Sequence, residues 1–343
     1  MIRCGRRIVS AAALVAAVAA GPVQANPGYH VLKDVVLGGE GGWDYLTVDA
    51  AARRLYITRG THVMVLDADS CTVVGDIPNT PGVHGVALAP ELGRGFTSNG
   101  QDSSVTIFDL KTLKELGRVQ VGRRPDAIVF DPASGRVFTM NAGSRDATAL
   151  DAATGKVAGK VVLDGKPEFA AVDGAGKLYV NLEDSSLIRV VDTRGLKVTA
   201  TWPLAPGEEP SGLALDAQRG RLFSTCGNQK LVVVGTEDGK VLASLPIGKG
   251  VDAGAFEPST GKVFTSNGEG TLTVAGEVAP GKFEVRETVT TKPGARTMAL
   301  DPKTHRVFTV TAQFGPAPAP TAEHPRPRRP MLPGTFELLV LGE

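Results

Sequence analysis

One short sequence pattern recurs every 40 to 44 residues along most of this chain, and it constrains the fold more than any other feature. Each copy has an apolar residue followed by Asp, a short turn, then Arg or Lys, apolar residues, an aromatic residue and usually Thr. A period in this range made of short strands is typical of the four-stranded blades of a β-propeller. The aromatic positions are Tyr56, Phe96, Phe138, Tyr179, Phe223, Phe264 and Phe308.

The repeat that begins at residue 126 divides into four predicted strands. Residues 126–131 form the innermost strand, and the Pro and Gly of residues 132–135 mark a turn. Residues 136–141 alternate apolar and polar side chains as a second strand should, and 147–151 and 156–163 are the third and outer strands. The same division gives seven units, at 43–82, 83–125, 126–167, 168–210, 211–250, 251–294 and 295–343.

The seventh unit has one strand too few. After its second strand come a Pro-rich stretch, 315–334, and a single apolar strand over 336–341. The segment 29–37 has strand character and belongs to no other unit, so we predict that it supplies the missing outer strand. Such closure removes sheet edges that would template aggregation. The predicted fold is an all-β, seven-bladed propeller with four-stranded antiparallel blades, forming one domain over 26–343.

Residues 1–25 have the composition of a targeting signal. Three arginines precede an apolar run over residues 8–20, which is too short to cross a bilayer as a permanent helix. Small residues at 23–25 offer a cleavage site, so we predict a signal peptide that is removed near Ala25. An uncleaved membrane anchor and a core helix are the alternatives. We therefore expect a periplasmic or secreted protein without a membrane span in the mature chain.

The charge and cysteine content exclude several classes of function. The formal net charge of +1 falls to −2 once the three arginines of residues 1–25 are removed, and aromatic residues make up only 5%. Both numbers argue against nucleic-acid binding. Cys71 and Cys226 fall in blades that are not neighbours, so no disulfide is expected. Without a CxxC motif, attached haem and cysteine-based zinc sites are not expected either. We expect a monomer.

Several segments of the chain resemble a known type of propeller repeat. They are Leu-Tyr-Val-Asn at 178–181, Val-Phe-Thr-Met-Asn at 137–141, the Thr-Gly-Lys turn at 154–156 and the Val-Gly-x-x-Pro link at 121–125. They resemble the YVTN-type β-propeller repeat, and the chain as a whole is similar to exported YncE-like propellers over nearly all of its mature length. This resemblance implies a periplasmic or surface propeller, and it implies no particular reaction.

Polar residues recur five positions before the repeat Asp, at the start of each inner strand. Structural symmetry places that position of every blade around one mouth of the central channel. Such a ring is either a solvated rim or a binding site for a small polar ligand or a protein partner. The candidate ligand-binding residues are Asp44, His84, Asp126, Glu168, Asp252 and Arg296, with Ser211 at the same position of blade 5.

Three members of this ring suit a metal ion. His84, Asp126 and Glu168 lie on consecutive blades and offer one imidazole and two carboxylates, which are ligands that divalent cations accept. With a bound cation, the same face could serve a metal-dependent hydrolase such as a lactonase. A binding or scaffold protein needs only the ring and the fold, so we favour that interpretation and assign no catalytic residue.

The stretch 315–334 departs most from the repeat, because it contains seven prolines. Its position makes it the loop between the second and third strands of blade 7, on the same face as the ring. A lid or partner site and a mobile surface insertion are equally compatible with this composition. The residues that would contact an anionic partner are Arg326, Arg328 and Arg329.

Two other recurring residues have predicted structural roles. The repeat aspartates, such as Asp131, precede turns in which their carboxylates accept backbone hydrogen bonds. Asparagines recur just after the second strand, as at Asn99 and Asn141, and we expect them to cap the following turn.

Overall fold

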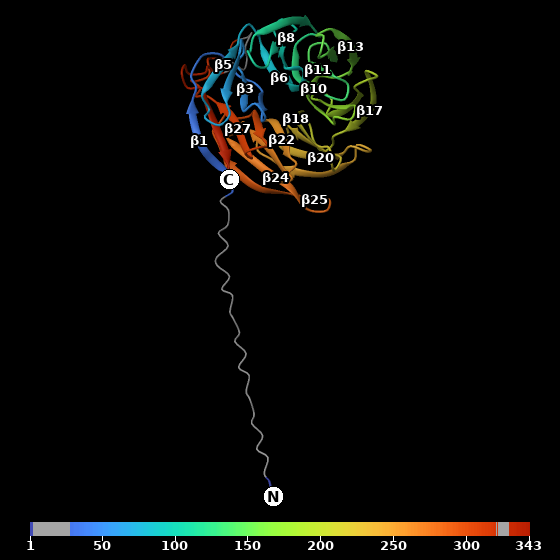
Figure 1. Ribbon diagram of the computed structural model, residues 1–343, viewed down its shortest axis with the longest axis vertical. Coiled ribbons are helices and arrows are strands. Elements are labelled where there is room, and N and C mark those ends of the chain that lie inside the picture. The colour runs from blue at the N-terminus through green and yellow to red at the C-terminus, as the bar shows by residue number, and fades with distance from the viewer. Residues whose placement is uncertain (3–27, 320, 322–328) are drawn as a thin grey trace.

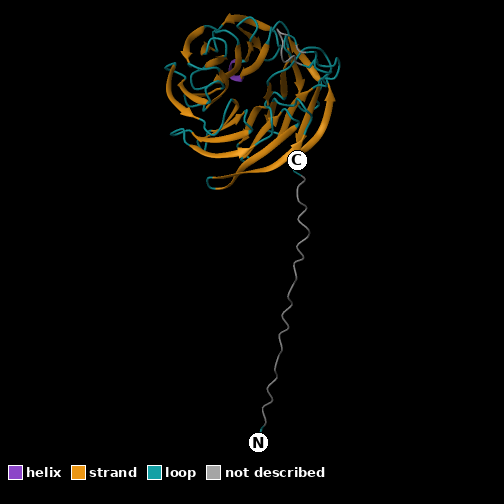
Figure 2. Cartoon of the chain, turned by 180° about the vertical axis from the view of Figure 1, so that it is seen from behind, coloured by secondary structure: helices purple, strands orange, loops and turns teal. Residues whose placement is uncertain are grey.

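The structure is a computed structural model and describes residues 1–2, 28–319, 321 and 329–343. Its strands form seven separate antiparallel sheets of four strands each. The sheets stand side by side around a central axis, as the blades of a closed ring (Figure 1). Apart from the short 3-10 helix η1 (Pro90–Leu92), the described chain consists of strands, turns and loops (Figure 2). The predicted seven-bladed propeller is therefore confirmed.

The strands follow one another from the inside of each blade to its outside. Blades 1 and 2 contain β2 (Leu46–Asp49), β3 (Arg54–Thr58), β4 (Val63–Asp67), β5 (Val73–Ile77), β6 (Val83–Ala89), β7 (Arg94–Asn99), β8 (Ser104–Asp109) and β9 (Glu115–Gln120). Blades 3 and 4 contain β10 (Pro125–Asp131), β11 (Arg136–Asn141), β12 (Asp146–Asp151), β13 (Val157–Val162), β14 (Pro167–Val172), β15 (Lys177–Leu182), β16 (Leu187–Asp192) and β17 (Lys197–Pro203). Blades 5 and 6 contain β18 (Pro210–Asp216), β19 (Arg221–Cys226), β20 (Lys230–Gly235), β21 (Val241–Pro246), β22 (Val251–Glu257), β23 (Lys262–Asn267), β24 (Thr271–Ala279) and β25 (Lys282–Thr290).

Blade 7 combines the first strand of the chain with its last three. Its strand order is β26 (Met298–Asp301), β27 (Arg306–Thr311), β28 (Glu337–Gly342) and β1 (His30–Val36). Strand β1 runs antiparallel to β28 from the pair His30–Gly342 to the pair Val36–Glu337. The prediction that the segment near residue 30 supplies the outer strand of blade 7 is thus confirmed. The loop at 315–334 connects β27 to β28, as expected.

The repeat aromatics bind neighbouring blades together. Phe138 is buried and packs in one hydrophobic cluster with Leu178 and Val180 of the next blade. The other six aromatic repeat residues are also buried, at 0 to 2% exposure. Outer strands are more exposed: in β13 four of the six residues are exposed, and Val161 is the buried one. The sequence period is therefore the period of the hydrophobic clusters that lie between neighbouring blades.

The repeat aspartates hold the turns between first and second strands, as predicted. In blade 3, the amides of Ala133 and Ser134 donate hydrogen bonds to the carboxylate of Asp131 at 3.3 and 3.1 Å. In blade 1, the amides of Ala51 and Ala52 donate to Asp49 Oδ1 at 3.1 and 2.8 Å. These carboxylates lie at the end of the inner strands that is opposite the candidate ring.

The recurring asparagines have a structural role that differs in detail from the expected one. Asn99 is fully buried, and its Nδ2 donates to the hydroxyls of Ser104 and Thr106 at 3.0 and 2.9 Å. Asn141 donates in the same way to Asp146 and Thr148. They tie the second strand to the third through side chains, where the sequence had predicted bonds to a turn.

Three further observations concern the remaining predictions. Cys71 and Cys226 are buried free thiols in separate hydrophobic clusters. Among the described residues, no helix is both long and apolar enough to cross a membrane. The apolar run and cleavage site of the predicted signal peptide lie within 3–27, outside the described residues.

Candidate functional site

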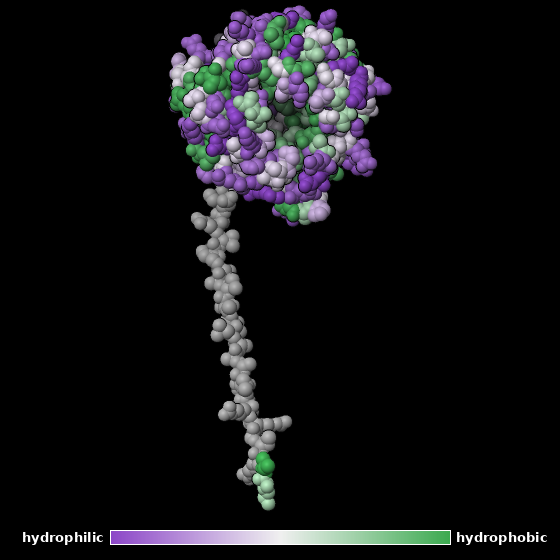
Figure 3. All heavy atoms as spheres, in the orientation of Figure 1, coloured by the Kyte–Doolittle hydropathy of each residue, from purple (hydrophilic) through white to green (hydrophobic). Residues whose placement is uncertain are grey.

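The candidate ring residues lie where the inner strands begin, at one mouth of the central channel. His84, Asp126, Glu168 and Asp252 belong to β6, β10, β14 and β22, and Asp44 and Arg296 precede β2 and β26 by two residues. The ring of blades is hollowed at its centre (Figure 3). All six side chains are half-buried.

A break in strand pairing occurs at the ring position of five of the seven blades. In blades 2 to 6 the register between inner and second strand shifts at the ring position, for example between Val83 and Val86 and between Pro125 and Ile128. Such bulges leave a residue outside the hydrogen-bond ladder and turn its side chain away from the regular pleat. Sequence patterns did not predict the bulges.

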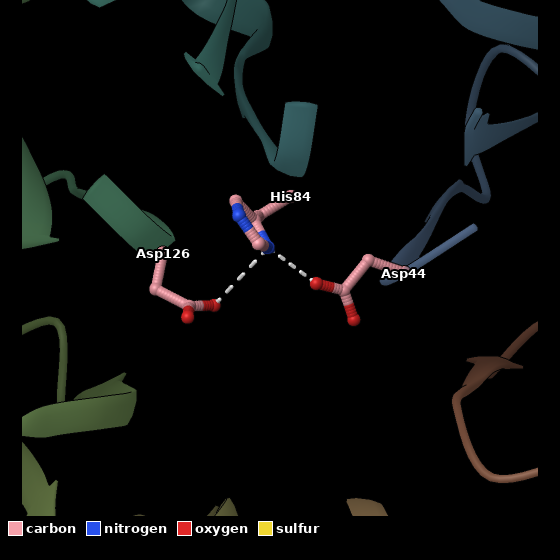
Figure 4. Close-up of side chains that lie close together, drawn as sticks. All are labelled: Asp44, His84 and Asp126. Carbon is pink, nitrogen blue, oxygen red and sulfur yellow. Dashed lines mark hydrogen bonds and ion pairs between the residues drawn. The ribbon is translucent and has the colours of Figure 1, made fainter. Parts of the chain in front are cut away.

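His84 lies between two carboxylates of neighbouring blades (Figure 4). Its Nδ1 is 2.5 Å from Asp44 Oδ2 and 3.7 Å from Asp126 Oδ1. Burial lowers the pKa of His84, but the hydrogen bond with Asp44 and the charge of Asp126 outweigh burial and raise it. Burial raises the pKa of Asp126 to about 6 even though the charge of His84 opposes that rise. The structure brings these three residues together closely enough to share one ion.

Arg296 links the other side of the mouth to Asp44. Its Nε is 3.2 Å from Asp252 Oδ2, and its Nη2 is 3.9 Å from Asp44 Oδ1. Burial raises the pKa of Asp252 to about 7, and Arg296 limits that rise. A concavity of about 680 Å³ adjoins this pair, and it is lined by Lys249, Gly250, Val251, Asp252, Gly268, Glu269, Gly294 and Arg296.

Glu168 pairs with a lysine that the sequence analysis did not select. Lys166 Nζ is 3.4 Å from Glu168 Oε2 and also pairs with Glu183. Glu168 Oε2 is buried and has no hydrogen-bond partner among the described residues. Burial, followed by the charge of Asp126, raises the pKa of Glu168 to about 8. Glu168 therefore lies apart from the group formed by Asp44, His84 and Asp126.

Tyr45 lies beneath the ring and was also missed from the sequence. Its side chain is 6% exposed and packs in one cluster with Ala127 and Ala170 of blades 3 and 4, so it reaches across the channel. Its ring meets Phe169 edge-on at a centroid distance of 5.0 Å. The hydroxyl forms no hydrogen bond with any other described residue. Burial and the carboxylates of the ring, Asp126 first, hold the pKa of Tyr45 well above its usual range.

The repeat contained a sequence signal for the aromatic pair Tyr45 and Phe169. Tyr45 and Phe169 occupy the position just after the ring residue. The other five blades have small residues there, namely Gly85, Ala127, Gly212, Ala253 and Thr297. Large aromatic residues in two blades, at a position where the other five have small residues, could have drawn attention to Tyr45 and Phe169.

In the described part of the loop at 315–334, one of the three arginines predicted to contact a partner bonds to the loop itself. Arg329 donates to the backbone oxygens of Gly315 and Phe314 at 2.8 and 2.9 Å, so it ties the two ends of the loop together. Arg326 and Arg328 lie outside the described residues. A partner-binding role of these arginines stays a prediction.

Solved structures similar to this one share its fold and differ in function. A chain in the crystal structure of a mitotic checkpoint complex is 13% identical with a TM-score of 0.75, and the match covers 98% of this chain and 99% of that one. A chain of hydrazine synthase from Kuenenia stuttgartiensis is 15% identical with a TM-score of 0.69, and the match covers 78% of this chain and 92% of that one. At such low identity the likeness shows the fold alone, and this fold serves many functions.

Comparison of the sequence with protein families identifies a family, whereas the solved structures show only the fold. No curated protein sequence matches the chain. A family model described as outer membrane protein assembly factor BamB matches residues 101–319, which is more than half of the chain and runs from blade 2 into blade 7. The chain therefore belongs to the family of outer membrane protein assembly factor BamB.

Proposed function

We propose that this protein is an exported binding propeller that takes a small ligand with a positively charged group at the channel mouth. The observation that carries the proposal is the imbalance of charge at that mouth. The ion pairs there join five carboxylates to only three basic side chains. Burial raises the pKa of three of the carboxylates, to about 6, 7 and 8. A cationic group at the mouth would offset both the cost of burying these carboxylates and the weaker repulsion between them.

Export is supported by the sequence of residues 1–25 and by the resemblance to YncE-like propellers with YVTN-type repeats. The family description names an outer membrane assembly factor, which also favours a location in the cell envelope. Fractionation of cells that express the full chain tests this part of the proposal. We expect the protein in the periplasmic or secreted fraction, with Asn26 as its first residue by N-terminal sequencing. A full-length protein in the cytoplasmic fraction would contradict export.

Binding at the mouth is tested with a thermal-shift panel of amines, amino acids, organic acids, neutral sugars and divalent cations. Cationic compounds should raise the melting temperature of the wild type by several degrees, because a ligand that binds only the folded state stabilises it. The double variant Asp44→Asn, Asp252→Asn should lose that response. Glu91→Gln is the matched control, because Glu91 is an exposed carboxylate near the turn end of an inner strand. Equal shifts in all three proteins, or none, would refute the proposal.

Hydrolysis of a small ester or lactone is a second candidate, favoured by the grouping of Asp44, His84 and Asp126. An ion held there would polarise a carbonyl oxygen and activate water. Lactone hydrolysis measured with and without added Mn²⁺ or Zn²⁺ distinguishes the two functions. A binding protein leaves the rate at background, whereas a hydrolase shows a metal-dependent rate that His84→Asn abolishes.

A further inference from the structure

We propose that Asp44, His84 and Asp126 form a site for one divalent transition-metal cation, such as Zn²⁺ or Mn²⁺. This inference rests on the binding function proposed above and names its ligand. It also exchanges one residue of the metal set predicted from sequence, because Asp44 approaches His84 and Glu168 pairs with Lys166.

The distances suit an ion without a large rearrangement. One ligand atom from each side chain lies within 4.8 Å of the other two. Ligands bonded to a metal at about 2.1 Å lie about 3.0 to 3.4 Å apart. The observed separations from His84 Nδ1, 2.5 Å to Asp44 and 3.7 Å to Asp126, fall on either side of that range. Small rotations of the two carboxylates would therefore let all three atoms coordinate one cation, which would replace the proton between His84 and Asp44.

The backbone leaves space for the imidazole in this orientation. A Cβ atom at residue 100 would come within 2.7 Å of His84 Nε2, so Gly100 provides the space for the ring. With the Nε2 edge packed against Gly100, the Nδ1 edge faces the two carboxylates. Gly100 has no positive φ, so alanine at this position would be opposed mainly by contact with His84, with the backbone oxygen of Gly82 next at 3.3 Å.

A second and independent feature is the hydroxyl of Tyr45. It belongs to a side chain that is 6% exposed and forms no hydrogen bond with any other described residue. The carboxylates of Asp126, Asp252, Asp44 and Glu168 all act on it, so it points into the ring. A water molecule or ligand oxygen on the cation would accept a hydrogen bond from this hydroxyl.

The donor set selects the kind of cation. One imidazole and two carboxylates suit Zn²⁺, Mn²⁺, Fe²⁺ or Co²⁺, whereas Ca²⁺ takes six to eight oxygen ligands. Three protein ligands leave further coordination positions facing the channel, which is the arrangement of sites that bind a second molecule. Arg296, next to Asp44, would lie beside such a molecule.

Calorimetric titration of metal-free protein, purified after expression of the full chain, tests the inference. We expect one Zn²⁺ or Mn²⁺ per chain in the wild type and much weaker binding of Mg²⁺. His84→Asn and Asp126→Asn should each weaken binding at least about a hundredfold, since each removes a ligand. His62→Asn is the matched control, because His62 also pairs with an aspartate, Asp76, at 3.7 Å but lies outside the ring. Wild-type affinity in His84→Asn, or no stoichiometric binding in the wild type, would overturn the inference.

A second variant guards against misfolding. Gly100→Ala keeps every ligand but displaces the His84 ring, so it should weaken Zn²⁺ binding about tenfold while circular dichroism stays native. Unchanged affinity would contradict the assigned imidazole geometry. The organic cations of the thermal-shift panel separate this inference from the function on which it rests. If they stabilise the wild type and Zn²⁺ and Mn²⁺ do not bind, the metal site is wrong and the binding function stands. If neither binds, both fail.

Discussion

At one end of the inner strands, the repeat aspartates each accept backbone hydrogen bonds within their own turn, as Asp131 does. At the other end the carboxylates face one another across the channel, and their partners are side chains of other blades. Asp44, for example, contacts His84 of blade 2 and Arg296 of blade 7. The first set recurs in most blades, whereas the second changes from blade to blade.

The difference teaches which carboxylates serve the fold and which are available to a ligand. A hydrogen-bonded turn aspartate lowers the free energy of the folded state in whichever blade contains it. Carboxylates that are half-buried beside one another raise that free energy, first through lost hydration and then through repulsion, as the raised pKa values of Asp252 and Glu168 indicate. The carboxylates at the turn end therefore stabilise the folded state, and those at the mouth destabilise it. Removing a carboxylate should lower stability at the turn end and raise it at the mouth.

The largest expected effect is at the turn end, with Asp301→Ala. This buried carboxylate accepts hydrogen bonds from Lys303 and Thr304 and pairs with Arg53 of blade 1 at 2.8 Å, so it joins the last blade to the first. Its loss should destabilise the protein by about 3 kcal/mol, because buried donors and a cation lose their acceptor. Urea denaturation at pH 7 measures the change.

The dependence on pH provides a check on this prediction. Burial raises the pKa of Asp301, but the bonds from Arg53 and Thr304 outweigh burial and lower it. A lowered pKa contributes stability above the pKa of the unfolded chain, about 4, and that contribution is lost as the pH falls further. Asp69→Asn removes the exposed partner of the same arginine and should cost less than about 1 kcal/mol. An equal loss of stability in Asp301→Ala and Asp69→Asn would mean that the buried carboxylate of Asp301 contributes no more than an exposed one.

The repeat was sufficient to predict the fold because every blade contains the same local information. The repeat Asp and the repeat aromatic, such as Asp131 and Phe138, keep a nearly constant spacing in each blade that contains both. A turn or a packed strand depends mainly on residues that are this close in the sequence. The ring positions could be aligned for the same reason. The pairing of His84 with Asp44 could not be predicted, because it depends on the bulge after Val83 and on contacts between blades. Tyr45 was missed because its large side chain departs from the repeat, and Lys166 was missed because its pairing with Glu168 depends on the folded chain.

At the mouth, Glu168→Gln should stabilise the protein at high pH. The folded pKa of Glu168 is about 8, against an ordinary value of 4.5. Between these values the folded state binds a proton that the unfolded state does not, so wild-type stability falls as the pH rises from 4.5 to 8. Glutamine removes this fall. We expect a gain of about 1 to 2 kcal/mol at pH 9 and none at pH 4, by urea denaturation at both pH values.

Glu91→Gln again serves as the control, since Glu91 is exposed near the turn end. Its effect on stability should be within about 0.5 kcal/mol at either pH. A loss of stability in Glu168→Gln at pH 9 would mean that the ion pair with Lys166 outweighs the burial of the Glu168 carboxylate and its repulsion by Asp126. The contrast between the two ends of the inner strands would then disappear.

Tyr45→Phe should produce the smallest change in stability and is the most specific test of the mouth. The hydroxyl has no hydrogen-bond partner among the described residues, so its removal should change the free energy of unfolding by less than about 0.5 kcal/mol. The aromatic contact with Phe169 is retained. A ligand at the mouth that accepts a hydrogen bond from Tyr45 should bind about threefold to tenfold more weakly to this variant, by the same calorimetric titration. Weaker binding at unchanged stability would assign the hydroxyl to the ligand, whereas lost stability at unchanged affinity would assign it to the fold.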